Sequence, residues 1–156
     1  EAAKSVVRAA CQMGLEDLLE QAPDTLSGGQ TQRLAIASEI AFDPEFLIMD
    51  DPTSQMDPVG RKEFFEWLAG CSEKTIFIVS NEVDDLCEIA DQLWVLEKGE
   101  LIASGKPLDV INQVAEGHDL YLPVVYRMAK ELGKKLPSGL FPVKLSELKR
   151  CFDDQN

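Results

Sequence analysis

Residues 26–30 read Leu26-Ser27-Gly28-Gly29-Gln30, and residues 46–54 read Phe46-Leu47-Ile48-Met49-Asp50-Asp51-Pro52-Thr53-Ser54. The first segment predicts a helix start with a capping box, in which Ser27 and Gln30 each bond to the other's backbone. Such a start also presents unpaired N–H groups at the positive end of a helix, where phosphate binds, and its glycines let an anion come close to the backbone. The second segment predicts a short apolar strand that ends in two carboxylates.

Together the two segments resemble the signature motif and the Walker B segment of ATP-binding-cassette (ABC) ATPases. The resemblance extends from Glu1 to about residue 113, and the later helical segments look like the C-terminal extension of energy-coupling-factor ATPases, which import vitamins or transition-metal ions. The sequence contains no Gly-x-x-x-x-Gly-Lys-Ser/Thr phosphate loop. Because Glu1 already lies within a helical pattern, we expect that loop (Walker A) to precede it.

The order of the predicted elements indicates an α/β fold with a parallel sheet similar to that of P-loop NTPases, incomplete without its Walker A half. We expect part of the ABC helical subdomain in residues 1–43 and the Walker B and switch part in residues 44–113. Residues 114–156 are predicted to form a helical C-terminal extension. Two runs, Phe46–Met49 and Thr75–Val79, read as strands buried on both faces. Without the P-loop strand between its neighbours, two strands would have unpaired backbone groups. We therefore expect the chain to close this gap by rearrangement, by swapping with a second copy or by pairing with something else.

The resemblance implies a role for each residue that matches a family motif. Ser27, Gly28, Gly29 and Gln30 would reach across a head-to-tail dimer to the γ-phosphate of ATP held by the partner's P-loop. Asp50 would help to hold Mg²⁺ through water, so the implied cofactor is Mg-ATP. Ser54 and Asp57 would be D-loop residues that contact the dimer partner, and Asp57 followed by Pro58 also predicts a helix N-cap.

Two positions depart from the family pattern at the catalytic site. Asp51 stands where the family carries the glutamate that polarises the attacking water, and its side chain is one methylene shorter. Asn81 stands where the family carries the switch histidine, and an amide donates a hydrogen bond but carries no positive charge. Because a misplacement of about 1 Å costs on the order of 100-fold in rate, we expect this chain's own catalytic site to be weak or inactive.

Composition excludes several functional classes. Net charge is −13, from 15 basic and 28 acidic residues, which argues against nucleic-acid binding and against direct docking on an anionic membrane. No apolar run reaches the roughly 18 residues of a membrane-spanning helix, so we expect no direct membrane insertion. Four widely separated cysteines and one histidine predict neither a zinc site nor a disulfide framework.

We therefore expect an ATP-binding subunit of a membrane importer, with a second ABC ATPase subunit and transmembrane transporter subunits as its partners. It would be cytoplasmic and peripheral to the inner face of the cell membrane. The alternative is a non-catalytic dimerisation or regulatory module derived from an ABC ATPase. Asp51 and Asn81 favour that alternative, while the intact Leu26–Gln30 opposes it. ABC ATPases of DNA repair are disfavoured by the acidic composition and by the lack of coiled-coil insertions. Exchanging Asn81→His and Asp51→Glu in a complete domain should raise ATPase activity only under the importer hypothesis.

Overall fold

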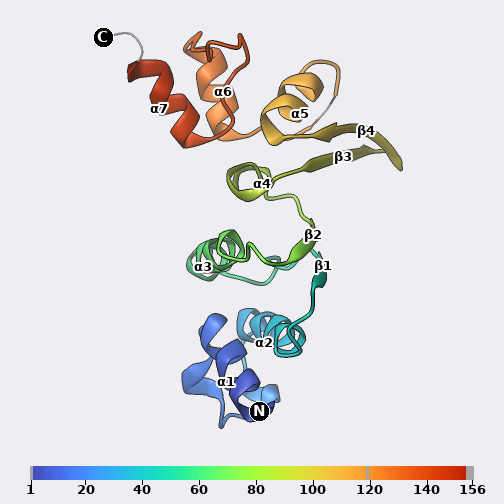
Figure 1. Cartoon of the computed structure of the whole chain (residues 1–156), viewed down its shortest axis with the longest axis vertical. Coiled ribbons are helices and arrows are strands. Elements are labelled where there is room, and N and C mark those ends of the chain that lie inside the picture. The colour runs from blue at the N-terminus through green and yellow to red at the C-terminus, as the bar shows by residue number, and fades with distance from the viewer. Residues whose placement is uncertain (1, 119, 154–156) are drawn as a thin grey trace. The chain divides into compact units, whose positions relative to one another are not determined.

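The computed structural model describes residues 2–118 and 120–153 and divides the chain into two compact units, residues 1–81 and 82–156 (Figure 1). The first unit contains α1 (Ala2–Gln12), the 3₁₀ turns η1 (Glu16–Leu18) and η2 (Pro23–Thr25), α2 (Gly28–Ile40), β1 (Phe46–Asp50), α3 (Pro58–Ala69) and β2 (Thr75–Val79). The second contains α4 (Val83–Ile89), β3 (Leu93–Glu97), β4 (Glu100–Gly105), α5 (Pro107–Val114), α6 (Val124–Glu131) and α7 (Leu145–Asp153).

Helix α1 packs against α2 at the start of the first unit. Buried small and apolar side chains line this contact, among them Ala9, Ala10 and Met13. The chain then turns at Gly14, which adopts φ 62°, a left-handed conformation that glycine reaches without steric cost. Helix α1 therefore ends just before this turn.

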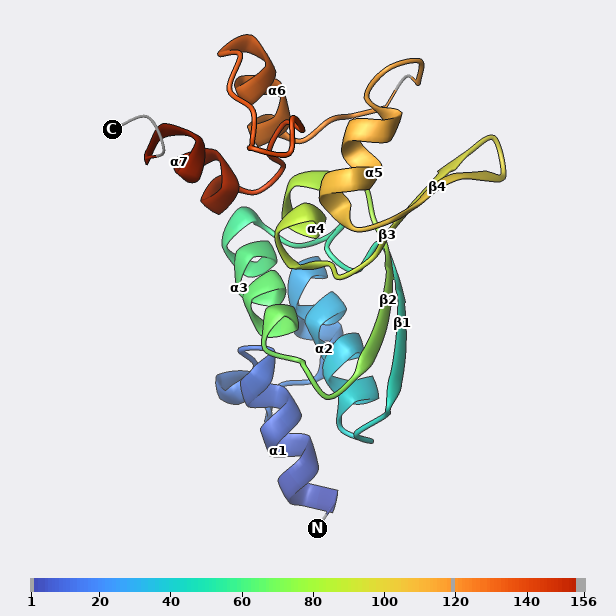
Figure 2. The same cartoon turned by 45° about the horizontal axis from the view of Figure 1, so that its top comes forward.

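Strands β1 and β2 pair in parallel, with Phe46 opposite Thr75 and Asp50 opposite Val79. Helices α2 and α3 lie on one side of this two-stranded sheet in both views (Figures 1 and 2). Leu47 and Met49 of β1 are buried, whereas Ile48 on the opposite face is 78% exposed. The prediction that both strands are buried on both faces is wrong. The described residues of this unit supply a layer for one face of the sheet and none for the other.

The hairpin β3–β4 forms a separate antiparallel sheet, so each sheet has two strands within the described part of the chain. Lys98 and Gly99 connect its strands and have φ 52° and 85°. Two consecutive positive φ values define the tight turn whose twist matches a hairpin. Lys98-Gly99 is therefore the hairpin turn. Rearrangement within the described residues does not close the gap left by the P-loop strand, because their strands form two separate sheets. Closure by swapping with a second copy or by pairing with another chain stays a prediction.

The second unit is built around a core of Cys87, Ile111, Tyr126 and Val143. Asn112 fixes the loop before α7, because its amide group donates to the Phe141 carbonyl at 2.8 Å and accepts from the Phe141 N–H at 2.9 Å. From Pro107 onward, the described helices are α5, α6 and α7.

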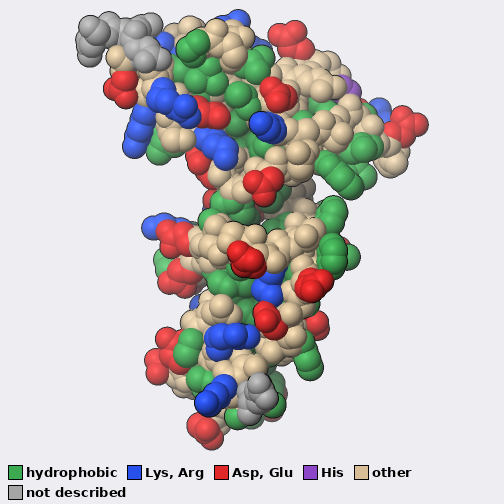
Figure 3. Space-filling view, viewed as in Figure 1, with side chains coloured by type: hydrophobic (Ala, Val, Ile, Leu, Met, Phe, Trp, Pro, Cys, Tyr) green, Lys and Arg blue, Asp and Glu red, His purple; other side chains and the backbone are tan. Residues whose placement is uncertain are grey.

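Charge is unevenly distributed along the chain. Residues 120–153 contain seven of the 15 basic residues but only three of the 28 acidic ones, and Figure 3 shows Lys and Arg side chains gathered over α6 and α7. Several of these cations lie over aromatic rings of the same unit, such as Arg127 over Tyr121 at 5.2 Å and Lys134 over Phe152 at 5.0 Å. Among the described helices, none combines the length and apolar character needed to cross a bilayer.

Candidate signature site at the start of helix α2

The predicted capping box is present at the start of α2. The Gln30 N–H donates to Ser27 Oγ at 3.3 Å, and the Ser27 N–H donates to Gln30 Oε1 at 2.8 Å. The Ser27 carbonyl accepts from the Thr31 N–H at 2.8 Å, as in a regular helix. Gly28 and Gly29 are the first two helical residues, and N–H groups at these positions have no intrahelical acceptor. This geometry can accept an anion at the helix start.

Ser27, Gly28, Gly29 and Gln30 line one side of an open pocket of about 340 Å³. The segment Gln55–Asp57 lines the other side. A Cβ added at Gly29 would lie 2.9 Å from the Gln55 carbonyl oxygen, whereas one at Gly28 would meet only the end of the Gln55 side chain at 3.4 Å. Gly29 is thus required by a close backbone approach within the chain itself, whatever it does for a ligand.

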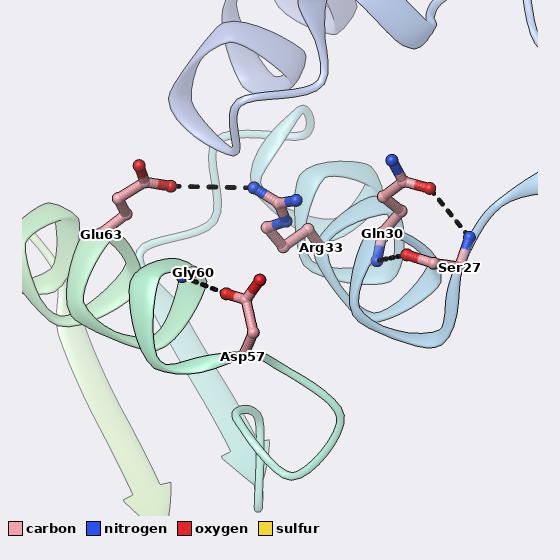
Figure 4. Close-up of polar contacts among 6 residues, drawn as sticks. All are labelled: Ser27, Gln30, Arg33, Asp57, Gly60 and Glu63. Atoms are coloured by element: carbon pink, nitrogen blue, oxygen red, sulfur yellow. Dashed lines mark hydrogen bonds and ion pairs between the residues drawn. The ribbon is translucent and has the colours of Figure 1, made fainter.

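A second helix start borders the same pocket (Figure 4). Asp57 caps α3 by accepting the Gly60 N–H at 2.7 Å, and Pro58 occupies the first helical turn. The predicted N-cap role of Asp57 is confirmed. Because α2 and α3 both begin at this pocket, the positive ends of two helix dipoles border it.

The candidate catalytic residues lie at a different place, at the carboxyl ends of β1 and β2. Asp50 pairs with Val79 in register, and the Asp51 N–H donates to the Val79 carbonyl at 2.8 Å. Asp50, Asp51 and Asn81 are exposed and do not line the α2 pocket. Asp51 adopts φ 46°, a conformation uncommon for residues other than glycine. Ser54 is exposed, and its N–H donates to the Asp51 carbonyl at 3.2 Å.

These residues fit a Mg-ATP cofactor only in part. Carboxylate oxygen is the ligand that Mg²⁺ prefers, and one or two carboxylates commonly suffice when substrate phosphates complete the shell. Asp50 and Asp51 supply such oxygens at one strand end. Within the described residues, no group of three or more His, Cys, Asp or Glu side chains is arranged to hold a metal. The donor set therefore suits an ion that is carried mainly by a nucleotide.

Sequence reasoning missed several residues of the pocket, chiefly Arg33 and Gln55. Arg33 lines the pocket from the second turn of α2, four residues after Gly29. Helical spacing offered a signal, because residues i and i+4 lie on the same face. Gln55 gave no such signal, because its contact with Gly29 depends on how the loop after β1 folds back.

The groups with a shifted pKa, among them Asp43 and Cys87, lie outside the pocket lining. Lys74 Nζ donates to Asp43 Oδ1 at 2.7 Å, and this hydrogen bond, together with the lysine charge, lowers the pKa of the Asp43 carboxyl. Burial raises the pKa of the Cys87 thiol to about 12. Neither group is among the residues that line the pocket.

Comparison with known proteins identifies the family. The family model described as "ABC transporter" matches residues 1–54. The energy-coupling factor transporter ATP-binding protein EcfA2 of Streptococcus pyogenes is 40% identical over 139 residues, which cover 86% of this chain and 50% of that protein. The same protein from another serotype of that species is 39% identical over 139 residues, with the same coverage of both chains. The chain thus spans about half the length of the curated relatives it matches.

Solved structures agree with this result. The cbiO1 protein of Clostridium perfringens, described as part of the ABC transporter complex cbiONQ, has a TM-score of 0.64 and 29% identity. That match covers 87% of this chain and 51% of cbiO1. A dimeric bacterial ABC transporter cassette gives a TM-score of 0.61 at 26% identity, covering 67% of this chain and 46% of the cassette. The predicted fold class and the resemblance to energy-coupling-factor ATPases are confirmed. From its motifs, its fold and these relatives, the chain belongs to the ABC transporter ATPase family, of whose nucleotide-binding domain it forms a part.

Proposed function

We propose that this chain donates its signature turn to an ATP molecule held by the P-loop of a second ABC ATPase subunit, within an importer of the energy-coupling-factor type. The observation that carries the proposal is the pocket in which Ser27–Gln30 faces Asp57 of the D-loop. The unpaired N–H groups of Gly28 and Gly29 and two helix dipoles suit a terminal phosphate. The substrate carried by the importer is left open by this site.

In this proposal the chain's own catalytic residues contribute little. Asp51 is shorter than the family's glutamate and sits on a backbone of positive φ, while Asn81 replaces a histidine. Transmembrane transporter subunits would be further partners, and through them the chain would lie at the cytoplasmic face of the membrane. Residues 114–156 would form the helical C-terminal extension.

The alternative function is a non-catalytic dimerisation or regulatory module. The left-handed backbone at Asp51 and the exposed Asn81 favour it. A non-catalytic module needs no helix start that faces a phosphate. A variant that blocks the start of α2 should therefore leave the activity of such a module unchanged. The two functions therefore differ in what they predict for Ser27.

The test uses an assembly with the EcfA2 relative whose own signature serine has been replaced, so that its P-loop lacks a working signature. Adding this chain should restore ATP hydrolysis. The rate of ATP hydrolysis restored by the Ser27→Arg variant should be at least about tenfold lower than that restored by the unmodified chain. The reason is that removal of one oxyanion donor lowers the rate on the order of 100-fold or more. Ser38→Arg is the matched control, because Ser38 is exposed on the same helix away from the pocket.

Calorimetric titration of the chain alone with Mg-ATP completes the test. The sequence contains no phosphate loop, so we expect no detectable binding. Restored hydrolysis that Ser27→Arg leaves intact would support the non-catalytic module instead. Tight binding by the isolated chain that Ser27→Arg abolishes would mean that a phosphate site forms without a partner, which would overturn the proposal.

A further inference from the structure

Arg33 connects three elements behind the signature pocket. Its Nη1 lies 3.8 Å from Oε2 of Glu63 on α3 (Figure 4). On the other side, a Cβ at Gly14 would lie only 3.3 Å from the same Nη1. The turn after α1 therefore closes directly against the guanidinium group, so the position of Arg33 depends on α1, α2 and α3 together.

The same side chain borders two hollows of the first unit. It lines the 340 Å³ signature pocket with Ser27–Gln30, and it lines a neighbouring pocket of about 250 Å³ with Gly14 and Glu63. Its side chain is 22% exposed, compared with 60% for Glu63. Arg33, like Gly60, therefore borders both pockets.

Arg33 and Glu63 lie at matching positions beyond the starts of α2 and α3. Arg33 lies one turn beyond Gln30 on α2, and Glu63 lies one turn beyond Gly60 on α3. Gln30 and Gly60 each donate their N–H to a capping side chain, Ser27 or Asp57. The ion pair between Arg33 and Glu63 therefore joins α2 and α3 about one turn beyond the two capped helix starts that border the pocket.

We propose that Arg33 is a positioning residue, which through Glu63 holds the signature turn of α2 at a fixed separation from the start of α3. This inference rests on the proposed function, because it concerns alignment of the turn on a phosphate. Stability alone gives the bridge little importance, because ion pairs between partly exposed side chains contribute little to the free energy of folding. Alignment gives it much more, since a displacement of about 1 Å costs on the order of 100-fold in rate.

The first experiment needs no partner. Amide hydrogen exchange of Gln30 and Gly60 is measured in the chain with Arg33→Gln. Both amides should exchange several-fold faster, because the two capped helix starts lose their common support. Lys62→Gln is the matched control, because Lys62 forms an exposed ion pair with Glu66 at 3.6 Å on α3. It should leave both amides unchanged.

The second experiment uses the assembly with the signature-deficient EcfA2 relative. Arg33→Gln should lower kcat by about 10- to 100-fold, while the KM for ATP, which the P-loop of the relative dominates, changes less than about threefold. Arg33→Lys should recover only part of kcat, because an ammonium lacks the planar fork of a guanidinium. Exchanging the charges with Arg33→Glu and Glu63→Arg should restore kcat to within about tenfold of wild type.

The outcomes separate this inference from the proposed function. If Arg33→Gln matches Lys62→Gln in both exchange and kcat while Ser27→Arg is inactive, the positioning role is wrong and the proposed function stands. A second result would refute the role of the planar guanidinium group. In that result Arg33→Gln is unfolded by circular dichroism, while Arg33→Lys keeps full activity. If Ser27→Arg keeps full activity, the proposed function and the positioning role both fail.

Discussion

Replacing Gly29 with alanine should destabilise the chain, whereas the same replacement at Gly28 should not. A Cβ at position 29 would lie 2.9 Å from the Gln55 carbonyl oxygen and 3.6 Å from the Met56 Cα. Both neighbours belong to the main chain, so relief requires the loop after β1 to shift. At position 28 the nearest atom is Gln55 Oε1 at 3.4 Å, and that side chain can rotate away.

The magnitudes can be estimated from two opposing effects. Glycine to alanine in a compatible helical conformation stabilises by about 0.4–1 kcal/mol. Forced overpacking costs about 1–3 kcal/mol. Gly28→Ala should therefore be neutral or stabilising, and Gly29→Ala should be roughly 1–2 kcal/mol less stable than Gly28→Ala. For a chain of this size, that difference corresponds to about 2–8 °C in Tm.

The assay is thermal and urea unfolding of the two alanine variants, each with and without Gln55→Ala. Gln55→Ala should not rescue Gly29→Ala, because the clash involves the main-chain oxygen. Equal Tm values for Gly28→Ala and Gly29→Ala would refute the argument, and so would rescue by Gln55→Ala. A purely ligand-directed role for these glycines predicts no difference in the absence of nucleotide.

Three further predictions concern single side chains. Thr53 is 4% exposed, and its hydroxyl has no hydrogen-bond partner among the described residues; Thr53→Val should therefore stabilise the chain by about 1 kcal/mol in urea unfolding, and a loss of stability would contradict this. Cys11 is exposed, whereas burial raises the pKa of the Cys87 thiol to about 12; iodoacetamide at about pH 8 should modify Cys11 and spare Cys87 by intact-mass analysis, because the thiolate is the reactive form. Lys74 lowers the pKa of Asp43 from 3.8. Their ion pair therefore stabilises the fold above that pH, and this stabilisation is lost as the pH falls through the folded-state pKa of Asp43. The fall in Tm between about pH 5 and about pH 2 should be smaller in Lys74→Met than in wild type.

Local features of the fold could be predicted from the sequence because the relevant residues are neighbours in the chain. The capping box at Ser27 and Gln30, the N-cap at Asp57 and the turn at Lys98-Gly99 each depend on contacts within about four residues. The positions of Asp50 and Asn81 at adjacent strand ends followed from parallel pairing. The expected roles of these residues with Mg-ATP and a partner subunit stay predictions.

Features that depend on tertiary packing were not predictable in the same way. An apolar run such as Phe46–Met49 reads alike whether one or both faces are covered, and only the structure shows Ile48 exposed. The approach of Gln55 to Gly29 and the bridge from Arg33 to Glu63 join residues 26 and 30 positions apart. No local pattern records such distances, because they arise from the way α2 and α3 pack.

The backbone at position 51 favours a change from glutamate to aspartate over the reverse change. Aspartate and asparagine tolerate a left-handed backbone better than longer side chains do, because their short polar groups can bond locally. With φ 46° at this position, Asp51→Glu places a longer side chain on a backbone that glutamate adopts less readily than aspartate does. A return from aspartate to glutamate at position 51 is therefore disfavoured as long as the loop after β1 keeps this geometry.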